Sequence, residues 1–252
     1  MLGGSPSRNA VSSEVGLPVT VDVASGNGVL WSAALGTEAY GGPVVAGGKV
    51  FVGTNNEKPR EPAVTGDRGV VMAFRASDGA FLWQAVHEKL PEGRSQDWPG
   101  QGVCSTPAVV GDRLYYLSNR AELVALDSEG FLDGENDGPL KDEAKHGERD
   151  ADFVWRIDLR KELGVVPRFM AASSPLVVGD LVFVLTGNGT GDGGKAPAPQ
   201  APSFLAVDRT TGEVGISKVR RIRFVGAANQ PPGAVGSAPP TRGAPPPAGT
   251  SP

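Results

Sequence analysis

The sequence predicts an all-β fold: a partial β-propeller with about three four-stranded antiparallel blades, followed by a disordered C-terminal tail. Glycine (36 residues) and proline (22 residues) are abundant, which is typical of many turns between short strands. A hairpin pattern recurs three times, and the composition changes abruptly after Val214. The predicted parts are therefore an N-terminal segment 1–26, incomplete blades over 27–214, and a basic Pro/Ala/Gly-rich tail over 215–252.

The hairpin repeat reads GGPVVAGGKVFVGT from Gly41, STPAVVGDRLYYLS from Ser105 and SSPLVVGDLVFVLT from Ser173. A proline opens each copy, where the first strand needs no N–H for its ladder. The Gly-Gly or Gly-Asp pair that follows suits the positive φ of a two-residue hairpin turn. The second strands, such as VFVGT and VFVLT, are continuously apolar, which predicts burial on both faces.

A second hairpin follows each first one, in GVVMAFRASDGAFLWQ, in AELVALDSEG with FVWRIDL, and in SFLAVDRTTGEV. Two successive hairpins make a four-stranded blade. The opening prolines recur 64 and 68 residues apart, whereas a minimal blade needs about 40–45 residues. We therefore expect long loops in EKLPEGRSQDWPGQG, between the first two blades, and in LDGENDGPLKDEAKHGERDAD, inside the second.

Tryptophan recurs at one position of the repeat. Trp83 and Trp155 occupy the last strand of the first two units, and Trp31 lies on an orphan strand before the first hairpin. We expect these three residues to pack the blades, and the orphan strand to close a ring. In the third unit the same position, four residues after Gly212, is Ile216. Trp98 falls outside the repeat and is a candidate for a loop surface.

The tail differs from the body in charge. All 28 acidic residues lie at or before Glu213, whereas five of the 24 basic residues lie after it: Lys218, Arg220, Arg221, Arg223 and Arg242. The acidic body disfavours nucleic-acid binding. Two hypotheses account for the tail, a natural flexible extension or, the favoured one, a reading-frame shift after Val214. Under the second hypothesis the expected tryptophan lies in another frame.

The pattern P-x-V-V-x-G-D-x-V-F followed by A-x-D-x-x-x-G-x-x-x-W, best seen in AFRASDGAFLW and LAVDRTTGEV, resembles the PQQ-like repeat of quinoprotein-dehydrogenase-like β-propellers. The resemblance covers roughly residues 3–214. It implies a parent protein with seven or eight blades that is periplasmic or secreted, although MLGGSPSRN has no signal-peptide pattern and a correct start would leave the chain cytoplasmic. It does not choose between enzyme and binding scaffold, because both use these blades.

One loop is a candidate calcium site. In DGENDG, Asp133, Glu135 and Asp137 take positions one, three and five, with Gly138 for the turn, and alternating oxygen ligands suit Ca²⁺. Position twelve is Ala144 instead of a bidentate glutamate. A solvated acidic loop is the favoured alternative.

The other motifs are weaker evidence for a functional site. Gly189-x-Gly191-x-x-Gly194 is a nominal dinucleotide fingerprint, but KAPAPQAP follows it where a helix is required. The only histidines, His87 and His146, form no metal motif. The single cysteine, Cys104, excludes the adjacent cysteine pair of the quinoprotein enzymes, and we expect it to be a buried structural residue.

The favoured function is a non-catalytic propeller repeat protein, or a fragment of one, that binds or scaffolds partners in the cell envelope. The alternatives are a fragment of a PQQ-dependent oxidoreductase and a nonfunctional gene remnant. No cofactor is expected in this chain, with PQQ and Ca²⁺ confined to a complete parent protein. The predicted partner is an unidentified protein, with no nucleic acid, no membrane span and self-association through open blade edges.

Overall fold

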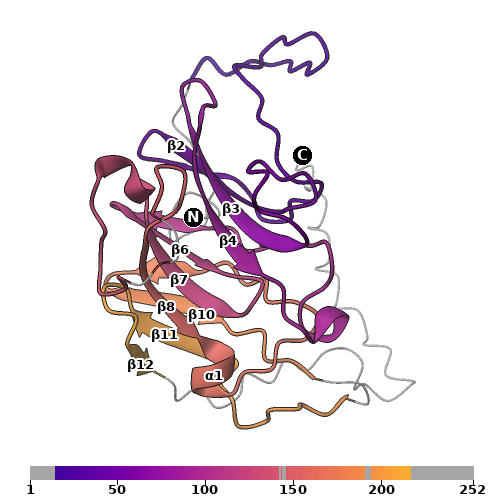
Figure 1. Cartoon of the computed structure of the whole chain (residues 1–252), viewed down its shortest axis with the longest axis vertical. Helices are drawn as coiled ribbons and strands as arrows, with labels where there is room; N and C mark the ends of the chain where they lie inside the picture. The colour runs from indigo at the N-terminus through magenta and orange to yellow at the C-terminus, as the bar shows by residue number, and fades with distance from the viewer. Residues whose placement is uncertain (1–14, 142, 144–145, 191–193, 217–252) are drawn as a thin grey trace, which may run out of the picture. The chain divides into compact units, whose positions relative to one another are not determined.

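The computed structural model describes residues 15–141, 143, 146–190 and 194–216, all within the first of two compact units, Met1–Ile222. The expected tail, 215–252, lies outside these residues except for Gly215 and Ile216, which belong to the last described strand. The described strands form three antiparallel four-stranded sheets, ordered β1-β2-β3-β4, β5-β6-β7-β8 and β12-β11-β10-β9. Figure 1 shows the three sheets following one another in chain order, from purple through magenta to orange. The predicted partial propeller is confirmed, and each sheet is one blade.

The first blade contains β1 (Val44–Ala46), β2 (Lys49–Asn55), β3 (Arg68–Arg75) and β4 (Phe81–Glu88). The second contains β5 (Ala108–Val110), β6 (Arg113–Leu117), β7 (Glu122–Asp127) and β8 (Phe153–Asp158). The third contains β9 (Leu176–Val178), β10 (Leu181–Leu185), β11 (Phe204–Asp208) and β12 (Val214–Ile216). The described helices are short: the 3-10 turns η1 (Gly93–Ser95) and η2 (Gly130–Asp133), and α1 (Leu159–Leu163). No helix in this part of the chain is long and apolar enough to cross a membrane.

The turn chemistry that the repeat predicts is present. Gly47 and Gly48 both have positive φ, 55° and 73°, between β1 and β2. Gly111 and Gly179 begin the equivalent turns at 62° and 57°. Each opening proline directly precedes the first strand of its blade. Local sequence therefore sets the first hairpin of every blade.

A tryptophan docks onto each of the three blades from the segment or blade that precedes it in the chain. The indole N–H groups of Trp31, Trp83 and Trp155 donate to the carbonyls of Ala76, Ser128 and Arg209 at 2.8, 3.1 and 3.1 Å. Each ring also lies against a glycine of the next blade: a Cβ added at Gly79, Gly130 or Gly212 would come within 2.5, 2.7 or 3.0 Å of it. We call this paired arrangement the tryptophan contact.

The interfaces between blades form the core. We call the side of a blade that meets the following blade its forward face and the opposite side its back face. The forward face of blade one, with Phe51, Ala73 and Trp83, packs on Leu114 and Tyr116 of the second blade. The forward face of blade two packs in the same way on the third, burying Tyr115, Leu117, Trp155, Val182, Val184 and Leu205.

The predicted orphan strand forms only in part. Trp31 makes its tryptophan contact, and Trp31, Ala33 and Leu35 pack on the back face of blade one. However, residues 28–36 contain no strand, because a strand requires a ladder of backbone hydrogen bonds and none joins these described residues to a neighbouring strand. Side-chain packing and hydrogen bonds that involve side chains therefore hold the segment in place.

The third blade preserves the backbone register of the other two. Trp83 pairs with Ala73 and Trp155 with Ala125, each beside a bulge, and Ile216 pairs with Ala206 beside the equivalent bulge. Burial differs. β2 is almost fully buried, as predicted, but β10 alternates between buried and accessible residues, because its forward face has no described blade against it.

Replacing Gly130 tests the tryptophan contact. Both Gly130 and Gly134 have left-handed φ, 61° and 80°, but only at Gly130 would a Cβ strike the Trp83 ring. We expect Gly134→Ala to cost about 1 kcal/mol of unfolding free energy and Gly130→Ala about 1–3 kcal/mol more. Urea unfolding of the two variants measures the difference. Equal losses would show that the ring does not constrain this turn.

Candidate functional site

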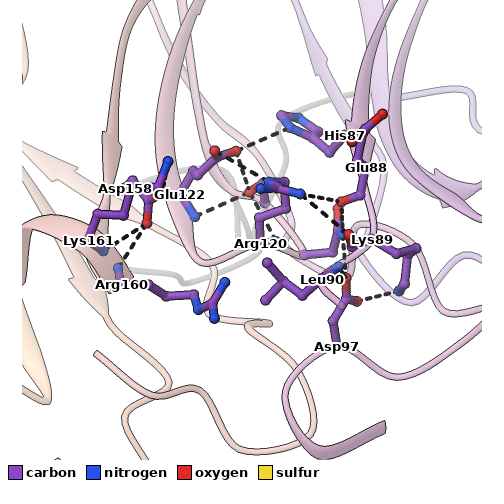
Figure 2. A network of polar contacts seen from close by, with 12 residues as sticks. His87, Glu88, Lys89, Leu90, Asp97, Arg120, Glu122, Asp158, Arg160 and Lys161 are labelled. Atoms are coloured by element: carbon purple, nitrogen blue, oxygen red, sulfur yellow. Dashed lines mark hydrogen bonds and ion pairs between the residues drawn. The ribbon is translucent and has the colours of Figure 1, made fainter. Parts of the chain in front are cut away.

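The main group of polar side chains lies where β4 ends beside the second blade. A pocket of about 500 Å³ opens there, lined by Val86, His87, Glu88, Arg120, Glu122, Arg156, Asp158, Lys161 and Glu162. Figure 2 shows part of this lining: His87 and Glu88 at the end of β4, Arg120 and Glu122 at the start of β7, and Asp158 and Lys161 where β8 leads into α1. α1 begins at this point because the Asp158 carboxylate accepts hydrogen bonds from the N–H groups of Arg160 and Lys161.

His87 and Glu122 form the buried base of the pocket. His87 Nε2 is hydrogen-bonded to the Tyr116 hydroxyl at 2.7 Å, and His87 Nδ1 lies 3.6 Å from Glu122 Oε2 (Figure 2). Arg120 Nε lies 3.5 Å from the other oxygen of Glu122. Burial pushes the pKa of Glu122 upward, but the hydrogen bond and charge of His87, with the charge of Arg120, outweigh burial and hold that pKa at about 2.

These groups are poorly suited to catalysis. Burial and the nearby Glu122 carboxylate hold the pKa of Tyr116 well above its usual value, so the phenol does not ionise near neutral pH. The Ser118 hydroxyl is buried and lies 3.3 Å from Glu122 Oε2, to which it donates. No nucleophile is therefore positioned against His87 among these residues.

A second polar cluster fixes the loop between β4 and β5. The Asp97 side chain is 1% exposed. Its carboxylate pairs with Lys89 and accepts hydrogen bonds from Leu90 N at 2.9 Å and Asn119 Nδ2 at 2.8 Å. Lys89 also donates to the Trp98 carbonyl at 2.8 Å. A fully paired buried carboxylate thus holds the loop, and Trp98 on it, against the second blade.

Trp98 belongs to a group of aromatic and cationic side chains on the loops that connect β4 to β5 and β8 to β9. We call this loop surface the rim. Its ring centroid lies 5.6 Å from that of Phe169, and two backbone hydrogen bonds join their loops: Trp98 N to Phe169 O at 2.8 Å and Phe169 N to Ser95 O at 2.9 Å. The Arg94 guanidinium lies 4.0 Å from the Trp98 ring and that of Arg168 lies 4.1 Å from the Phe169 ring. We call these four side chains the rim patch.

Phe169 is conformationally unusual. It is 42% exposed and has φ of 65°, a left-handed conformation that is costly for a bulky residue. The hydrogen bonds to Trp98 and Ser95 hold it there. Strain of this kind concentrates where a protein presents a side chain for a purpose.

The predicted calcium residues occupy one loop but are engaged differently. Asp133 Oδ1 accepts a hydrogen bond from Glu135 N at 2.9 Å, whereas Asp137 Oδ2 lies 2.7 Å from Arg113. Arg113 also lies 2.7 Å from the carboxylate of Asp127, and burial raises the pKa of Asp127 to about 6. No group of three His, Cys, Asp or Glu able to hold a metal ion occurs among the described residues, and Ala144 lies outside them. The calcium site stays a prediction.

The remaining candidate residues have structural surroundings. Cys104 is 7% exposed, and burial raises its thiol pKa to about 11, so it is a poor nucleophile. His146 packs on Phe131 with ring centroids 5.2 Å apart. No α-helix follows the glycine fingerprint over residues 194–202. Trp31, Trp83 and Trp155 pack the blades as expected.

Sequence reasoning singled out Trp98 but missed Phe169, Arg94 and the buried clusters below them. Trp98 and Phe169 lie on different connecting loops, and nothing in either loop indicates the other. His87 and Glu122 likewise belong to different blades. The charged residues of SQDWPG and EKLPEGR indicated a charged loop around a tryptophan. They did not indicate which residue that tryptophan would contact.

The protein family described as "Outer membrane protein assembly factor BamB" matches the chain over residues 3–137 and over residues 67–215. No curated protein sequence matches it.

Three of the similar solved structures are a europium-containing methanol dehydrogenase (17% identity, TM-score 0.42), a quinohemoprotein alcohol dehydrogenase from Comamonas testosteroni (18%, 0.39) and BamB from Moraxella catarrhalis (15%, 0.37). The matches cover 73%, 70% and 71% of this chain. The chain spans 25%, 21% and 36% of the lengths of those proteins, respectively.

Acid titration tests the pairing of Glu122. Because its pKa is about 2 in the folded chain and ordinarily 4.5, the ionised carboxylate stabilises the fold above about pH 4.5, and this contribution is lost as the pH falls toward 2. We expect Glu122→Gln to lower the unfolding free energy at pH 7 by on the order of 2 kcal/mol, with the gap from the unsubstituted chain narrowing below pH 4.5.

Urea unfolding at several pH values measures this gap. Glu88→Gln is the matched control, because the Glu88 side chain lines the same pocket but is 76% exposed. It should change stability by less than about 0.5 kcal/mol. A gap for Glu122→Gln that is independent of pH would contradict the assignment.

Proposed function

The chain belongs to the family of the outer membrane protein assembly factor BamB, and we propose that it is a non-catalytic β-propeller module that binds a protein partner in the cell envelope. The rim patch is the observation that supports this proposal most directly. The family description supports the compartment, and the proposed location is the periplasm.

The rim patch has the composition of a binding surface. Tryptophan and arginine are enriched among the residues that dominate the free energy of protein–protein association. Trp98 is half-buried, and Arg94 and Phe169 are exposed, so a partner can reach the rings and the cations together. The Arg94 guanidinium over the Trp98 ring adds a cation to this surface, which suits a partner with acidic or carbonyl groups.

The patch is also held in position before any partner binds. The Asp97 cluster fixes the loop of Trp98, and the two backbone hydrogen bonds fix Phe169 against it. A surface whose side chains are already ordered loses less conformational entropy on binding. The buried network of Figure 2 therefore supports binding by positioning the rim.

The described residues do not fit a quinone–calcium centre. Such a centre requires an adjacent cysteine pair in the enzymes that the sequence resembles, and the chain has one cysteine. It also requires converging metal ligands, and the described residues contain no such set of three His, Cys, Asp or Glu. We propose that this chain acts without PQQ.

Crosslinking from the rim tests the binding function. We expect a photoreactive amino acid at Arg94, introduced into the chain in the cells that produce it, to give a discrete crosslinked protein in the envelope fraction. Trp98→Ala in the same chain should reduce that product at least about tenfold, because loss of a central aromatic typically costs more than 2 kcal/mol of binding. The same probe at Val45, an exposed residue of β1, should not give the product. An equal product from Val45, or none from Arg94, would overturn the proposal.

Reconstitution tests the non-catalytic part. Incubation of the purified chain with PQQ and Ca²⁺ should give neither bound-quinone absorbance after desalting nor dye-linked oxidation of primary alcohols. Either signal, at a level proportional to protein concentration, would establish an oxidoreductase instead.

A further inference from the structure

The outer edge of β4 lies along a groove between the first two blades. Val86 and Glu88 of β4 line two pockets, the candidate-site pocket of about 500 Å³ and a second of about 470 Å³. Arg156 of β8 also lines both. The β2–β3 loop contributes Ala63 and Val64 to the second pocket. The two pockets therefore meet beside Val86, and we call their combined space the edge groove.

The chain itself pairs with this edge at one point. Gln84 N donates to Arg149 O at 3.0 Å, and Ala151 N donates to Gln84 O at 3.1 Å. Asp150, between these two residues, thereby forms a parallel β-bridge with Gln84. The N–H and C=O of Gln84 thus point away from β3, and a short extended segment binds them.

Two residues further along β4 the same edge is open. The N–H and C=O of Val86 point the same way as those of Gln84, because this direction repeats every second residue and the β3–β4 register is regular between them. No hydrogen bond from a described residue reaches either group. At Glu88 the edge is used again, since its carbonyl accepts from Asn119 Nδ2 at 3.1 Å and from Arg120 at 3.2 Å. Val86 is therefore an unpaired position between two occupied ones.

The edge groove also contains a cation without a carboxylate partner. Arg156 is exposed, and no ion pair or hydrogen bond joins it to another described residue. Its guanidinium lies 5.9 Å from the centroid of the Phe153 ring. Arg120, by contrast, lies 3.5 Å from the carboxylate of Glu122. An acidic side chain that entered the groove would give Arg156 a charged partner.

We propose that the edge groove binds an extended segment of a partner protein, one residue of which pairs with Val86 as Asp150 pairs with Gln84. Addition of a segment to a free strand edge takes affinity from main-chain hydrogen bonds and specificity from side-chain pockets. Successive side chains of an extended segment point to opposite sides. An acidic residue can therefore meet Arg156 while its neighbours lie against the apolar residues of the β2–β3 loop. The segment that fits alternates apolar and acidic residues.

A second copy of the chain does not suit this edge. Residues 149–151 lie on it beside Val86 in each copy, so two β4 edges cannot approach each other closely enough to pair. The edge groove shares no residue with the rim patch. The inference therefore stands independently of the proposed function, and substitutions in the two surfaces can be compared directly.

Fluorescence anisotropy of the labelled peptide Thr-Val-Asp-Val-Thr-amide with the full chain tests the groove. Two further peptides carry N-methyl groups on alternate residues, one on both valines and the other on the aspartate and the last threonine. We expect one of them to bind within about twofold of the parent peptide and the other at least about tenfold more weakly, because only every second N–H of an added segment faces β4. Equal binding of both, equal loss of both, or no binding of the parent peptide up to about 1 mM would overturn the proposal.

Substitutions in the chain test the two contacts separately. Arg156→Glu should weaken binding at least about tenfold and should restore it for a peptide with lysine in place of aspartate. Lys58→Glu makes the same charge change at an exposed residue outside the groove and should leave binding unchanged. Val86→Pro removes the outward N–H but no hydrogen bond to β3, and it should weaken binding at least about tenfold.

Far-UV circular dichroism establishes whether each variant folds. If Val86→Pro did not fold, the charge reversal at Arg156 would decide, because that side chain is exposed. Equal weakening by Lys58→Glu, or no rescue of Arg156→Glu by the lysine peptide, would contradict the proposed segment.

Discussion

The described structure depends on one contact, in which an indole from the preceding part of the chain is held between a carbonyl and a glycine of each blade. It recurs at Trp31, Trp83 and Trp155 with nearly the same hydrogen-bond length. A buried indole N–H without an acceptor is costly, and so is a carbonyl left without a donor. A fixed donor and acceptor therefore set how far one blade can slide over its neighbour, and the apolar faces pack within that limit.

This contact explains why the faces of the blades are unequal. In repeat folds each unit gains most of its stability from the neighbours it touches. Both faces of the second blade are covered by a neighbouring blade, and its strands β6 and β7 are almost wholly buried. Among the described residues, the third blade has a cover on one side only, and β10 alternates accordingly. Strands of similar sequence are therefore buried to different extents, because the burial of a strand depends on whether a neighbouring blade covers its face.

The rim shows how a buried charge can serve an exposed surface. Asp97 has Lys89, Leu90 and Asn119 as partners, so its desolvation is compensated and its geometry is fixed. Trp98 is the next residue in the chain, so the fixed position of Asp97 also fixes the backbone of Trp98. Glu122 and His87 form a second buried pair, at the base of the pocket beside α1. The buried Asp97 cluster is consequently a support for the loop of Trp98.

The sequence by itself determined the elements: the hairpins, their Gly-Gly and Gly-Asp turns, four strands to a blade, and the equivalence of Ile216 with Trp83 and Trp155. These depend on neighbours within a few residues, through proline, glycine and the alternation of apolar side chains. The tertiary structure alone decided that Trp31 packs without forming a strand, that Phe169 meets Trp98, and that Asp137 binds Arg113. Those outcomes depend on contacts between residues far apart in the chain, and no local pattern encodes which distant partner will satisfy a buried charge or cover an aromatic ring.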